Sequence, residues 1–295
     1  MKGATAADEL APGLYLVATP IGNLNDITLR ALAVLRGVNL VLAEDTRRTR
    51  KLLSHFDIRA RLQSLHAHNE AARAPRLAER LAAGERMALV SDAGTPLISD
   101  PGHELVRAAL AAGVAVIPVP GPSAVLAALM ASGLPLDRFT FAGYLPRKRG
   151  PRGRLFASLA SDPGTLVFLE SPRRLARSLA DATRVLGARP AVVARELTKV
   201  HEELVRGTLP EVAARFAEGE VRGEVVVCIG GSGKLAVDAA EHPAAAAGAL
   251  DREALRCRFE ELLADGATRN DALKQIATEQ GLKRRDIYTF LMVES

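Results

Sequence analysis

Short apolar runs alternate with amphipathic stretches in the first half of the chain. Within the runs, hydrophobic residues stand at consecutive positions, as in strands buried on both faces, whereas the stretches between them repeat with helical spacing. The runs are 14–18, 38–43, 64–67, 87–90 and 114–119, and the helical stretches are 27–36, 46–56, 70–83 and 102–112. Asp26 is the expected N-cap of the first helix, and Gly37 its end. The pattern predicts a mostly parallel sheet covered by helices.

The second half combines similar runs with shorter connections. Strand-like runs occur at 139–142, 165–169, 191–194, 203–205 and 224–229, and helices are expected at 123–132, 172–186 and 210–218. Several connections are too short for a helical crossover, so this sheet is expected to be antiparallel or mixed. The chain as a whole is therefore predicted to be an α/β protein.

An alanine-rich segment, 238–248, is interpreted as a linker to a C-terminal tail. Residues 252–264 form an amphipathic pattern, and 270–281 with 283–288 predict two short helices around a glycine turn, similar to a helix-turn-helix. A small helical bundle used only for packing is the alternative. The expected domains are 13–122, 123–235 and 250–295, with the linker at 236–249.

Composition limits the classes of function. The net charge of +5 over 295 residues is compatible with a polyanionic partner without requiring one. Aromatic residues make up 4% and Trp is missing, which argues against a stacking surface for single-stranded nucleic acid. Cys228 and Cys257 stand far apart, with no ligand nearby at metal-site spacing. No signal-peptide core and no run of membrane-spanning length is found, so a cytoplasmic protein is expected.

Two loops rich in turn-forming residues follow successive strand-like runs. The first, 91–102, contains Asp92 and Asp100, and the second is 119–124. In an open α/β fold such loops lie side by side at the carboxyl edge of the sheet, where ligands bind. A third loop, 19–26, lacks the spaced glycines of a dinucleotide fingerprint and the glycine–lysine pair of a phosphate loop. A small-molecule site at this edge is the leading hypothesis.

Charged residues gather after the second strand-like run. Glu44 and Asp45 stand at its end, and four basic residues follow within 47–51. A capped helix with solvated cations explains the basic residues. It does not explain two carboxylates that look buried, because carboxylates near a core are costly unless they are paired. We therefore expect an ion pair between Asp45 and Arg47 or Arg50.

Further charged groups occur in the second half. Residues 146–154 hold five basic side chains, which form either a mobile loop that grips phosphates or a solvated surface. Glu170 closes one strand-like run, and Lys199 and His201 follow another. A lone histidine at such a place is more often structural than catalytic. Lys199 is expected to lie near other cations and to be partly desolvated, which would lower its pKa and let it accept a proton.

Taken together, these segments resemble the ribosomal RNA small subunit methyltransferase I family within the tetrapyrrole methylase superfamily. The matching segments are 16–27, 44–47 with Thr49, 91–102, 118–124, 170–173 and 195–199. They cover about residues 13–232, and their combined specificity is high although each alone is modest. Residues 250–292 are similar to a small helical C-terminal domain of the family, in a much less distinctive way.

The resemblance implies a two-domain, tetrapyrrole-methylase-like α/β fold, a homodimer, and S-adenosylmethionine bound in the cleft between the domains. It also implies methylation of the ribose 2′-hydroxyl of a decoding-centre cytidine in 16S rRNA, within the 30S subunit. The implied cofactor contacts are Pro20, Ser91, Asp92, Ala93, Gly94, Thr95, Asp100, Pro120, Gly121, Pro122, Ser123, Leu169, Glu170, Ser171, Ala194, Arg195 and Glu196.

The chemistry of methyl transfer assigns further roles. The ribose hydroxyl is a weak nucleophile that must be aligned and must lose its proton, for which Lys199 and Glu44 are the candidates. The sulfonium charge disappears during transfer, so backbone carbonyls rather than carboxylates are expected beside the sulfur, and Asp100 is left for cofactor or nucleotide. No metal ligand set is expected. The residues expected to hold the RNA are Arg47, Arg48, Arg147, Lys148 and Arg149.

Two other functions remain open at this point. A tetrapyrrole C-methyltransferase of the same fold would also place a basic cleft around an acidic macrocycle. A nucleic-acid-binding regulator without catalytic activity would use the helix-turn-helix-like tail. The segment 45–47, the basic stretch 146–154 and the helical tail favour RNA over the macrocycle.

Overall fold

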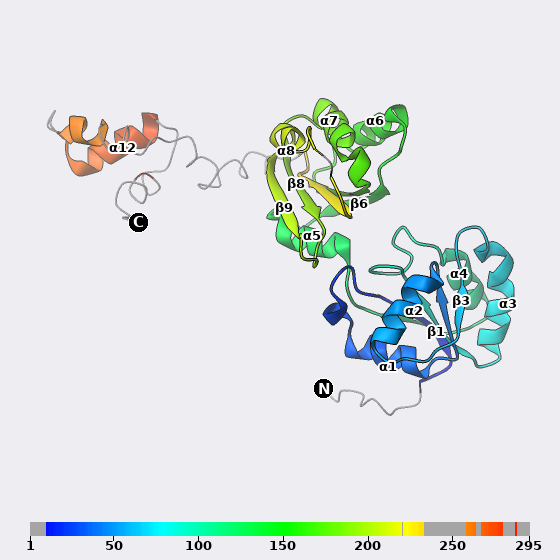
Figure 1. Cartoon of the computed structure of the whole chain (residues 1–295). Coiled ribbons are helices and arrows are strands. Elements are labelled where there is room, and N and C mark those ends of the chain that lie inside the picture. The colour runs from blue at the N-terminus through cyan, green and yellow to red at the C-terminus, as the bar shows by residue number, and fades with distance from the viewer. Residues whose placement is uncertain (1–9, 220, 233–257, 264–266, 280–286, 288–295) are drawn as a thin grey trace. The chain divides into compact units, whose positions relative to one another are not determined.

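The computed structural model describes residues 10–219, 221–232, 258–263, 267–279 and 287. The chain divides into two compact units, 1–233 and 234–295. The first unit contains two five-stranded sheets, and its elements are labelled in Figure 1. The linker predicted at 236–249 and much of the predicted tail lie outside the described residues.

The first sheet is parallel, as predicted. Its strands are β1 (Gly13–Val17), β2 (Leu40–Ala43), β3 (Leu62–Ser64), β4 (Arg86–Val90) and β5 (Val116–Val119), in the order β3-β2-β4-β1-β5. All four pairings between neighbours are parallel. The strand expected at 64–67 is wrong by about two residues, because β3 pairs with β2 at Leu62 and ends at Ser64.

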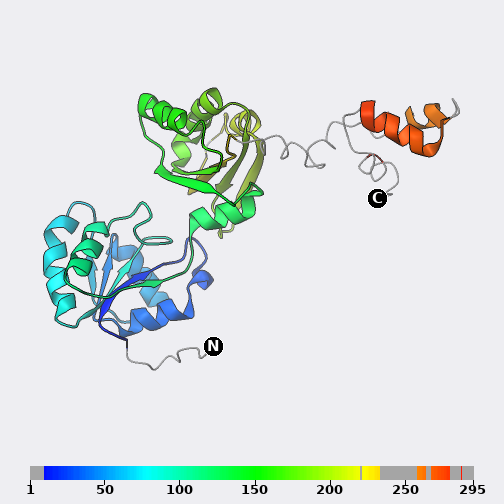
Figure 2. The same ribbon diagram turned by 180° about the vertical axis from the view of Figure 1, so that it is seen from behind.

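Helices cover both faces of this sheet, which can be followed from two sides in Figures 1 and 2. On one face α1 (Leu29–Gly37) and α2 (Thr46–His55) pack against Tyr15 and Val17 of β1. On the other face α3 (Glu70–Ala82) and α4 (His103–Ala111) pack against Leu14. The consecutive apolar positions of each strand are thus divided between two cores, as expected for a strand buried on both faces.

The first helix begins later than predicted. Thr28 is its N-cap, and the Thr28 hydroxyl oxygen accepts a hydrogen bond of 3.1 Å from the Ala31 amide. Asp26 instead ends a short 3-10 helix, η1 (Leu24–Asp26). The prediction of Asp26 as the cap is wrong because the turn of 3-10 helix comes first and α1 begins only after it. Threonine, like aspartate, is a favoured capping residue.

The second sheet is mixed, as predicted. Its strands are β6 (Phe139–Tyr144), β7 (Thr165–Glu170), β8 (Pro190–Arg195), β9 (Glu203–Thr208) and β10 (Val225–Ile229), in the order β6-β7-β10-β8-β9. Only the pairing of β6 with β7 is parallel among these strands, and the other three are antiparallel.

Alternate residues of the second sheet face different helices. Val167 and Cys228 pack in one core with α5 (Ala124–Ser132), which follows β5 of the first sheet. Leu166 and Phe168 pack in the opposite core, to which α6 (Arg149–Ser158), α7 (Leu175–Leu186) and α8 (Leu209–Arg215) contribute. A short 3-10 helix, η2 (Pro172–Arg174), connects β7 to α7.

The stretch 146–154 is largely helical, which corrects the expectation of a loop. Helix α6 starts at Arg149, and the Arg152 side chain is only 5% exposed. Arg152 forms an ion pair with buried Asp181 and donates to the carbonyl oxygens of Pro146 and Arg147 at 3.1 and 3.2 Å. One of the five cations therefore holds the turn before α6 and is not available to a partner.

In the second unit, the described residues include α12 (Arg269–Glu279) and a helical segment at 258–263. Phe259, Leu262, Leu273, Ile276 and Ile287 form a small apolar cluster. Among the residues that the structure describes, no helix is long and apolar enough to cross a membrane.

A buried glutamate fixes the loop between β4 and α4. Helix α4 has Gly102 as its N-cap, which offers no capping side chain, and the Glu70 carboxylate accepts hydrogen bonds from the Glu104 and Leu105 amides at 2.6 and 3.2 Å. Gly102 has a φ of +129°, and a Cβ there would lie 2.4 Å from a Leu89 methyl carbon. Both features hold the end of the 91–102 loop against α3 and β4.

We predict that Glu70→Ala lowers the free energy of unfolding by about 1–2 kcal/mol, because two amides at a helix N-terminus lose their acceptor. Urea unfolding followed by circular dichroism measures the change. Glu70→Gln keeps an acceptor oxygen and should lose less, and Glu79→Ala, at an exposed position of the same helix, is the matched control. Equal midpoints for Glu70→Ala and Glu79→Ala would contradict this role.

Candidate active site

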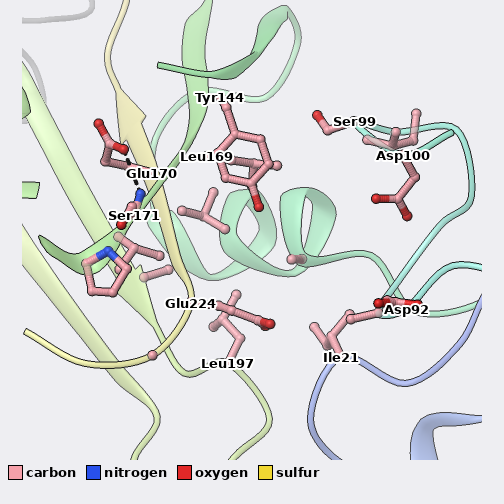
Figure 3. A pocket seen from close by; sticks show the side chains of 18 of the residues that line it. Ile21, Asp92, Ser99, Asp100, Tyr144, Leu169, Glu170, Ser171, Leu197 and Glu224 are labelled. Carbon is pink, nitrogen blue, oxygen red and sulfur yellow. Dashed lines mark hydrogen bonds between the residues drawn. The ribbon is translucent and has the colours of Figure 1, made fainter. Parts of the chain in front are cut away.

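A cavity of about 500 Å³ lies where loops of the first sheet meet strand ends of the second. Figure 3 shows Ile21, Asp92 and Asp100 on one side and Glu170 and Ser171 on the other. The residues that line it are Ile21, Glu44, Asp45, Arg48, Asp92, Ala93, Ile98, Ser99, Asp100, Ala124, Tyr144, Leu169, Glu170, Ser171, Pro172, Ala194, Leu197, Gly223, Glu224, Val225 and Val226.

Carboxylates dominate the lining of this cavity. Six acidic residues contribute to it, and Arg48 is the basic one among its lining residues. The exposed Arg48 guanidinium lies 3.9 Å from the Asp92 carboxylate. The site therefore carries a negative field that favours ligands with amino, hydroxyl or cationic groups.

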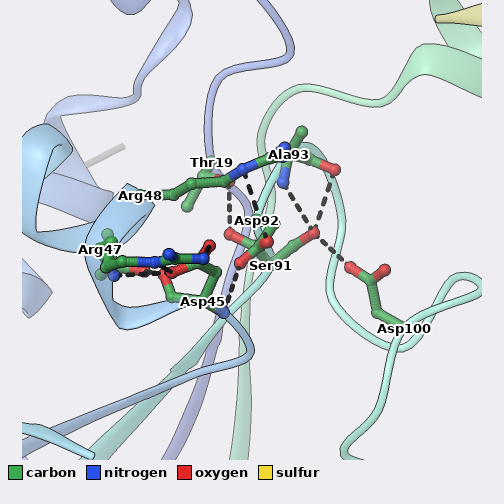
Figure 4. A network of polar contacts seen from close by, with 9 residues as sticks. Thr19, Asp45, Arg47, Arg48, Ser91, Asp92, Ala93 and Asp100 are labelled. Carbon is green, nitrogen blue, oxygen red and sulfur yellow. Dashed lines mark hydrogen bonds and ion pairs between the residues drawn. The ribbon is translucent and has the colours of Figure 1, made fainter. Parts of the chain in front are cut away.

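Asp92 joins two loops that follow strands of the first sheet. Its carboxylate accepts a hydrogen bond of 2.9 Å from the Asp45 amide (Figure 4). Asp45 caps α2 and pairs with Arg47 at 2.9 Å, as the sequence predicted. The hydrogen bonds from Arg47 lower the pKa of Asp45 to about 2. The loop after β2 and the loop after β4 are thus fixed to each other at the carboxyl edge of the sheet.

Ser91 and Asp100 close the 91–102 loop on itself. The Ser91 hydroxyl donates to the Asp100 carboxylate, and the Thr19 hydroxyl donates to the Ser91 carbonyl oxygen at 2.9 Å (Figure 4). Leu97 and Ser99 have φ values of +70° and +67°. Non-glycine residues in this region are strained, and such strain is typical of ligand-binding loops whose surroundings determine their shape.

Two acids of the cavity hold their protons more tightly than usual. Burial raises the pKa of Asp100, and the neighbouring Asp92 adds to the shift although the Ser91 hydrogen bond opposes it. Burial also raises the pKa of Glu44, followed by repulsion from Asp100 and Asp92, while His66 and Arg48 partly offset this. The Glu44 residue as a whole is exposed, so the expectation that it is buried is wrong.

Glu170 stabilises the end of β7 and is not one of the free acids of the cavity. Its side chain is buried and accepts hydrogen bonds from the Ser171 amide and the Ser178 hydroxyl, and it forms an ion pair with Arg174. The cavity therefore meets the ends of β7 and β8 chiefly at Leu169, Ser171 and Ala194.

Lys199 lies outside the cavity lining and behaves differently from the prediction. Its ammonium group lies 2.8 Å from the Glu196 carboxylate and 3.5 Å from that of Glu224. Burial alone would lower the pKa of Lys199, but these two partners outweigh it and raise the pKa. The predicted lowered pKa is wrong, because carboxylates and not cations surround this lysine.

The structure brings together some of the predicted site residues in the lining of the cavity. These are Glu44, Arg48, Asp92, Ala93, Asp100, Leu169, Glu170, Ser171 and Ala194. Others stand in the same loops or strand ends but outside the lining: Pro20, Ser91, Gly94, Thr95, Pro120, Gly121, Pro122, Ser123, Arg195, Glu196 and Lys199. Arg47, Arg147, Lys148 and Arg149 also lie outside it.

Tyr144 is a lining residue that sequence analysis did not find. It is 60% exposed, and Figure 3 shows its hydroxyl pointing into the cavity. The pairing of β6 with β7 shifts register between Phe141 and Tyr144, and Gly143 within this bulge has a φ of +68°. A bulge redirects the side chain that follows it, and the glycine alone gives little indication of one. Glu224 was missed as well.

Comparisons with known proteins agree with this fold and cleft. Residues 13–213 match the family described as Tetrapyrrole (Corrin/Porphyrin) Methylases. The solved structure of the methyltransferase CobJ is 21% identical, covers 75% of this chain and 94% of its own, and superposes with a TM-score of 0.56. At this identity the likeness establishes the fold alone.

Two relatives of higher sequence identity indicate a more specific family within the tetrapyrrole methylases. Ribosomal RNA small subunit methyltransferase I from Halalkalibacterium halodurans is 45% identical over 277 residues, which are 93% of each chain. The protein of the same name from Xylella fastidiosa is 54% identical over 225 residues, which are 75% of this chain and 82% of the relative. This chain belongs to the tetrapyrrole methylases and, within them, to the ribosomal RNA small subunit methyltransferase I family.

S-adenosylmethionine, the methyl donor that this family implies, matches the chemistry of the cleft. The cavity volume lies within the range of small-molecule sites. Asp92, Asp100 and Glu224 offer carboxylates to amino and hydroxyl groups, while β7 and β8 offer backbone near Leu169 and Ala194. Among the described residues, no group of three His, Cys, Asp or Glu side chains is arranged to hold a metal ion.

We predict that Asp100→Asn stabilises the protein at neutral pH. The raised pKa of Asp100 means that the folded state binds this proton more tightly than the unfolded chain, so the contribution of Asp100 to stability is lost as pH rises through the folded pKa. The asparagine of the variant does not ionise, so the variant does not lose this stability as pH rises. Its advantage over the parent in urea unfolding should be present at about pH 7 and disappear toward about pH 4.

Asp162→Asn is the control of opposite sign. The Thr140 hydroxyl and the Gly164 amide lower the pKa of Asp162, so its ionised form stabilises the folded state. This variant should be less stable than the parent at neutral pH. If Asp100→Asn were also destabilising there, the Asp100 carboxylate would not be under electrostatic strain.

Proposed function

We propose that this chain transfers the methyl group of S-adenosylmethionine to the ribose 2′-hydroxyl of a decoding-centre cytidine in 16S rRNA, acting in the cytoplasm on the 30S subunit. The observation that carries the proposal is the extent of the match to relatives named ribosomal RNA small subunit methyltransferase I, which reaches 93% of both chains. The acidic cleft supports it, because a cationic methyl donor is attracted to such a field.

The arrangement of acids suggests a division of work. S-adenosylmethionine, when bound, supplies an electrophilic methyl group whose positive charge is lost during transfer. Asp92 and Asp100 are proposed to hold donor groups of the bound molecules. Glu44 is the proposed acceptor of the hydroxyl proton, because it lines the cavity and has a raised pKa.

Lys199 is proposed as a positioning residue and not as a base, since its raised pKa keeps it protonated. Its ammonium group neutralises Glu196 and partly balances Glu224, which lines the cavity. The Glu224 amide also donates a 3.0 Å hydrogen bond to the Glu196 carboxylate. These contacts hold Glu224, and with it the lining segment 223–226, in place.

Exposed cations on the first and second domains are the proposed RNA contacts. Arg47 and Arg48 stand at the start of α2 beside the cavity, and Arg147 and Lys148 precede α6. The Arg149 guanidinium lies 3.3 Å from the Asp181 carboxylate, which also pairs with Arg152, but Arg149 itself is well exposed. Such side chains position an RNA backbone without reading its sequence.

A homodimer is also proposed, and one surface supports it. On α5, Leu126 is 51% exposed and Met130 is 77% exposed, and their spacing of four residues places them on the same side of the helix. Apolar side chains exposed on adjacent turns are typical of an interaction surface. A second copy of the chain is the occupant that the family resemblance favours.

The tetrapyrrole alternative is less well supported. Its substrates carry several carboxylates, which Glu44, Asp92, Asp100 and Glu224 of the cavity lining would repel. A methyl-transfer assay that offers 30S subunits and a precorrin side by side discriminates the two. Label transferred only to the macrocycle would contradict the proposed function, and binding of nucleic acid without any methyl transfer would favour a regulator.

We predict that Glu44→Gln lowers the rate of methylation of 30S subunits by about 10²–10⁴-fold, the usual range for loss of a general base. The dissociation constant for S-adenosylmethionine, measured by calorimetry, should change little. In the parent, activity rises with pH as Glu44 loses its proton, at a higher pH than for an ordinary glutamate. The variant should lack this rise, and Glu79→Gln, an exposed change of the same kind, should keep it. A Glu44→Gln enzyme with normal rate would assign the proton to another group.

We predict that Tyr144 provides a stacking surface for the target base. Tyr144→Ala should raise the KM for 30S subunits roughly tenfold, because stacking on an aromatic ring contributes about 1–3 kcal/mol per base. Tyr144→Phe keeps the ring and should behave like the parent. Affinity for S-adenosylmethionine separates the alternatives: if Tyr144→Ala weakens cofactor binding instead, the ring contacts the methyl donor and not the RNA.

A further inference from the structure

A second hollow lies at the far end of α2 from the active site. Its volume is about 440 Å³, and it is lined by residues 50, 53, 54 and 58–62. Leu53 and Ile58 form a buried apolar floor, while Arg50, Arg59 and Arg61 are exposed around it. No acidic residue contributes to the lining.

The three arginines of this hollow lack ion-pair partners within the described part of the chain. Other exposed arginines near the first sheet do face carboxylates, as Arg47 faces Asp45 at 2.9 Å and Arg107 faces Glu104 at 3.5 Å. Arg61 interacts with Glu85 only at longer range, because the Glu85 carboxylate already accepts two hydrogen bonds from Arg80. Asp57 is the acid nearest in sequence and is exposed, with no bond to these arginines. The hollow therefore carries an uncompensated positive charge.

Helix α2 connects the hollow to the active site. The helix starts at Thr46, directly after Asp45, which lines the catalytic cavity together with Arg48. Its ten residues span about 15 Å. Arg47 and Arg50 are three residues apart and so lie on one side of the helix, and both are exposed. Exposed cations thus lead from the cavity mouth along α2 to Arg59 and Arg61.

We propose that this hollow, defined by Arg50, Arg59 and Arg61, binds backbone phosphates of the rRNA strand next to the nucleotide being methylated. Guanidinium groups suit the proposal because they bind phosphate oxygens with two parallel hydrogen bonds. The apolar floor of Leu53 and Ile58 gives the neighbouring ribose a surface to pack on. The proposal rests on the proposed function, since it takes the RNA to be the strand that enters the catalytic cavity.

Three like charges around one hollow repel one another, and this repulsion destabilises the folded protein when no anion is bound. Binding of a polyanion reverses that cost, because each neutralised phosphate releases a condensed counterion. The site therefore contributes affinity and register on the RNA, while the active site contributes the chemistry. Residues of the hollow do not touch the reacting atoms.

The test is the double variant R59A/R61A in the full chain. We expect the KM for 30S subunits to rise about five- to tenfold with kcat little changed, and the affinity for S-adenosylmethionine to stay the same. Binding of a fluorescein-labelled oligouridylate should weaken, and the slope of log K against log salt should fall by about 1.4, since each phosphate contact on a single strand contributes about 0.7.

The matched control is R107A/R215A. It removes the same charge from exposed arginines on α4 and α8, each of which faces a glutamate. An equal effect of the control would mean that overall charge and not the hollow matters, which overturns the proposal. So would a higher KM for 30S subunits with unchanged oligouridylate binding, because the hollow would then bind a ribosomal protein.

The oligouridylate measurement also separates this proposal from the proposed function. If the parent protein does not methylate 30S subunits but R59A/R61A still loses RNA affinity and salt dependence, the function fails while the hollow remains an RNA site. If the parent methylates normally and the variant equals it in every readout, the hollow is refuted and the function stands.

Discussion

The site depends on side-chain oxygens that accept hydrogen bonds from backbone amides. Asp92 accepts from the Asp45 amide, and Glu70 accepts from two amides at the start of α4. These bonds connect the loops after β2 and β4 and fix both ends of the 91–102 loop. A charged acceptor makes such bonds shorter and stronger than neutral ones, so a loop with two strained non-glycine residues keeps one conformation.

The same constraint explains why the cavity tolerates so many acids. Glu170 is fully engaged by Ser171, Ser178 and Arg174, so its charge stabilises the connection from β7 to α7. Asp100 and Glu44 have fewer partners, and their raised pKa values record the energy stored in unpaired or crowded carboxylates. Carboxylates that are destabilised in this way gain the most free energy when a ligand brings hydrogen-bond donors to them.

Much of the fold could be predicted because most strands are apolar on consecutive positions and several helices, such as α1, α2 and α5, begin at a capping residue. The loop 91–102 was predictable for the same reason, since turn-forming residues follow a buried strand. The role of Lys199 was not, because its pKa depends on the folded positions of Glu196 and Glu224, and Glu224, 25 residues away in sequence, reaches it only in the folded chain. Arg152 was taken for a surface cation because nothing local indicates its buried partner Asp181. Tyr144 depends on a bulge, which has no strong sequence signal.

The two sheets, with the loops at their edges, divide electrostatics and shape between them. The first supplies Glu44, Asp92 and Asp100 from loops at the carboxyl edge of a parallel sheet, where successive strands bring their ends together. The second sheet supplies apolar and backbone surface, such as Leu169 and Ala194 at the ends of β7 and β8, together with the Glu224 carboxylate. A small molecule held between them would meet three carboxylates on one side, and Glu224 beside apolar walls on the other. The apolar side lowers the local dielectric and so strengthens every charge interaction on the acidic side.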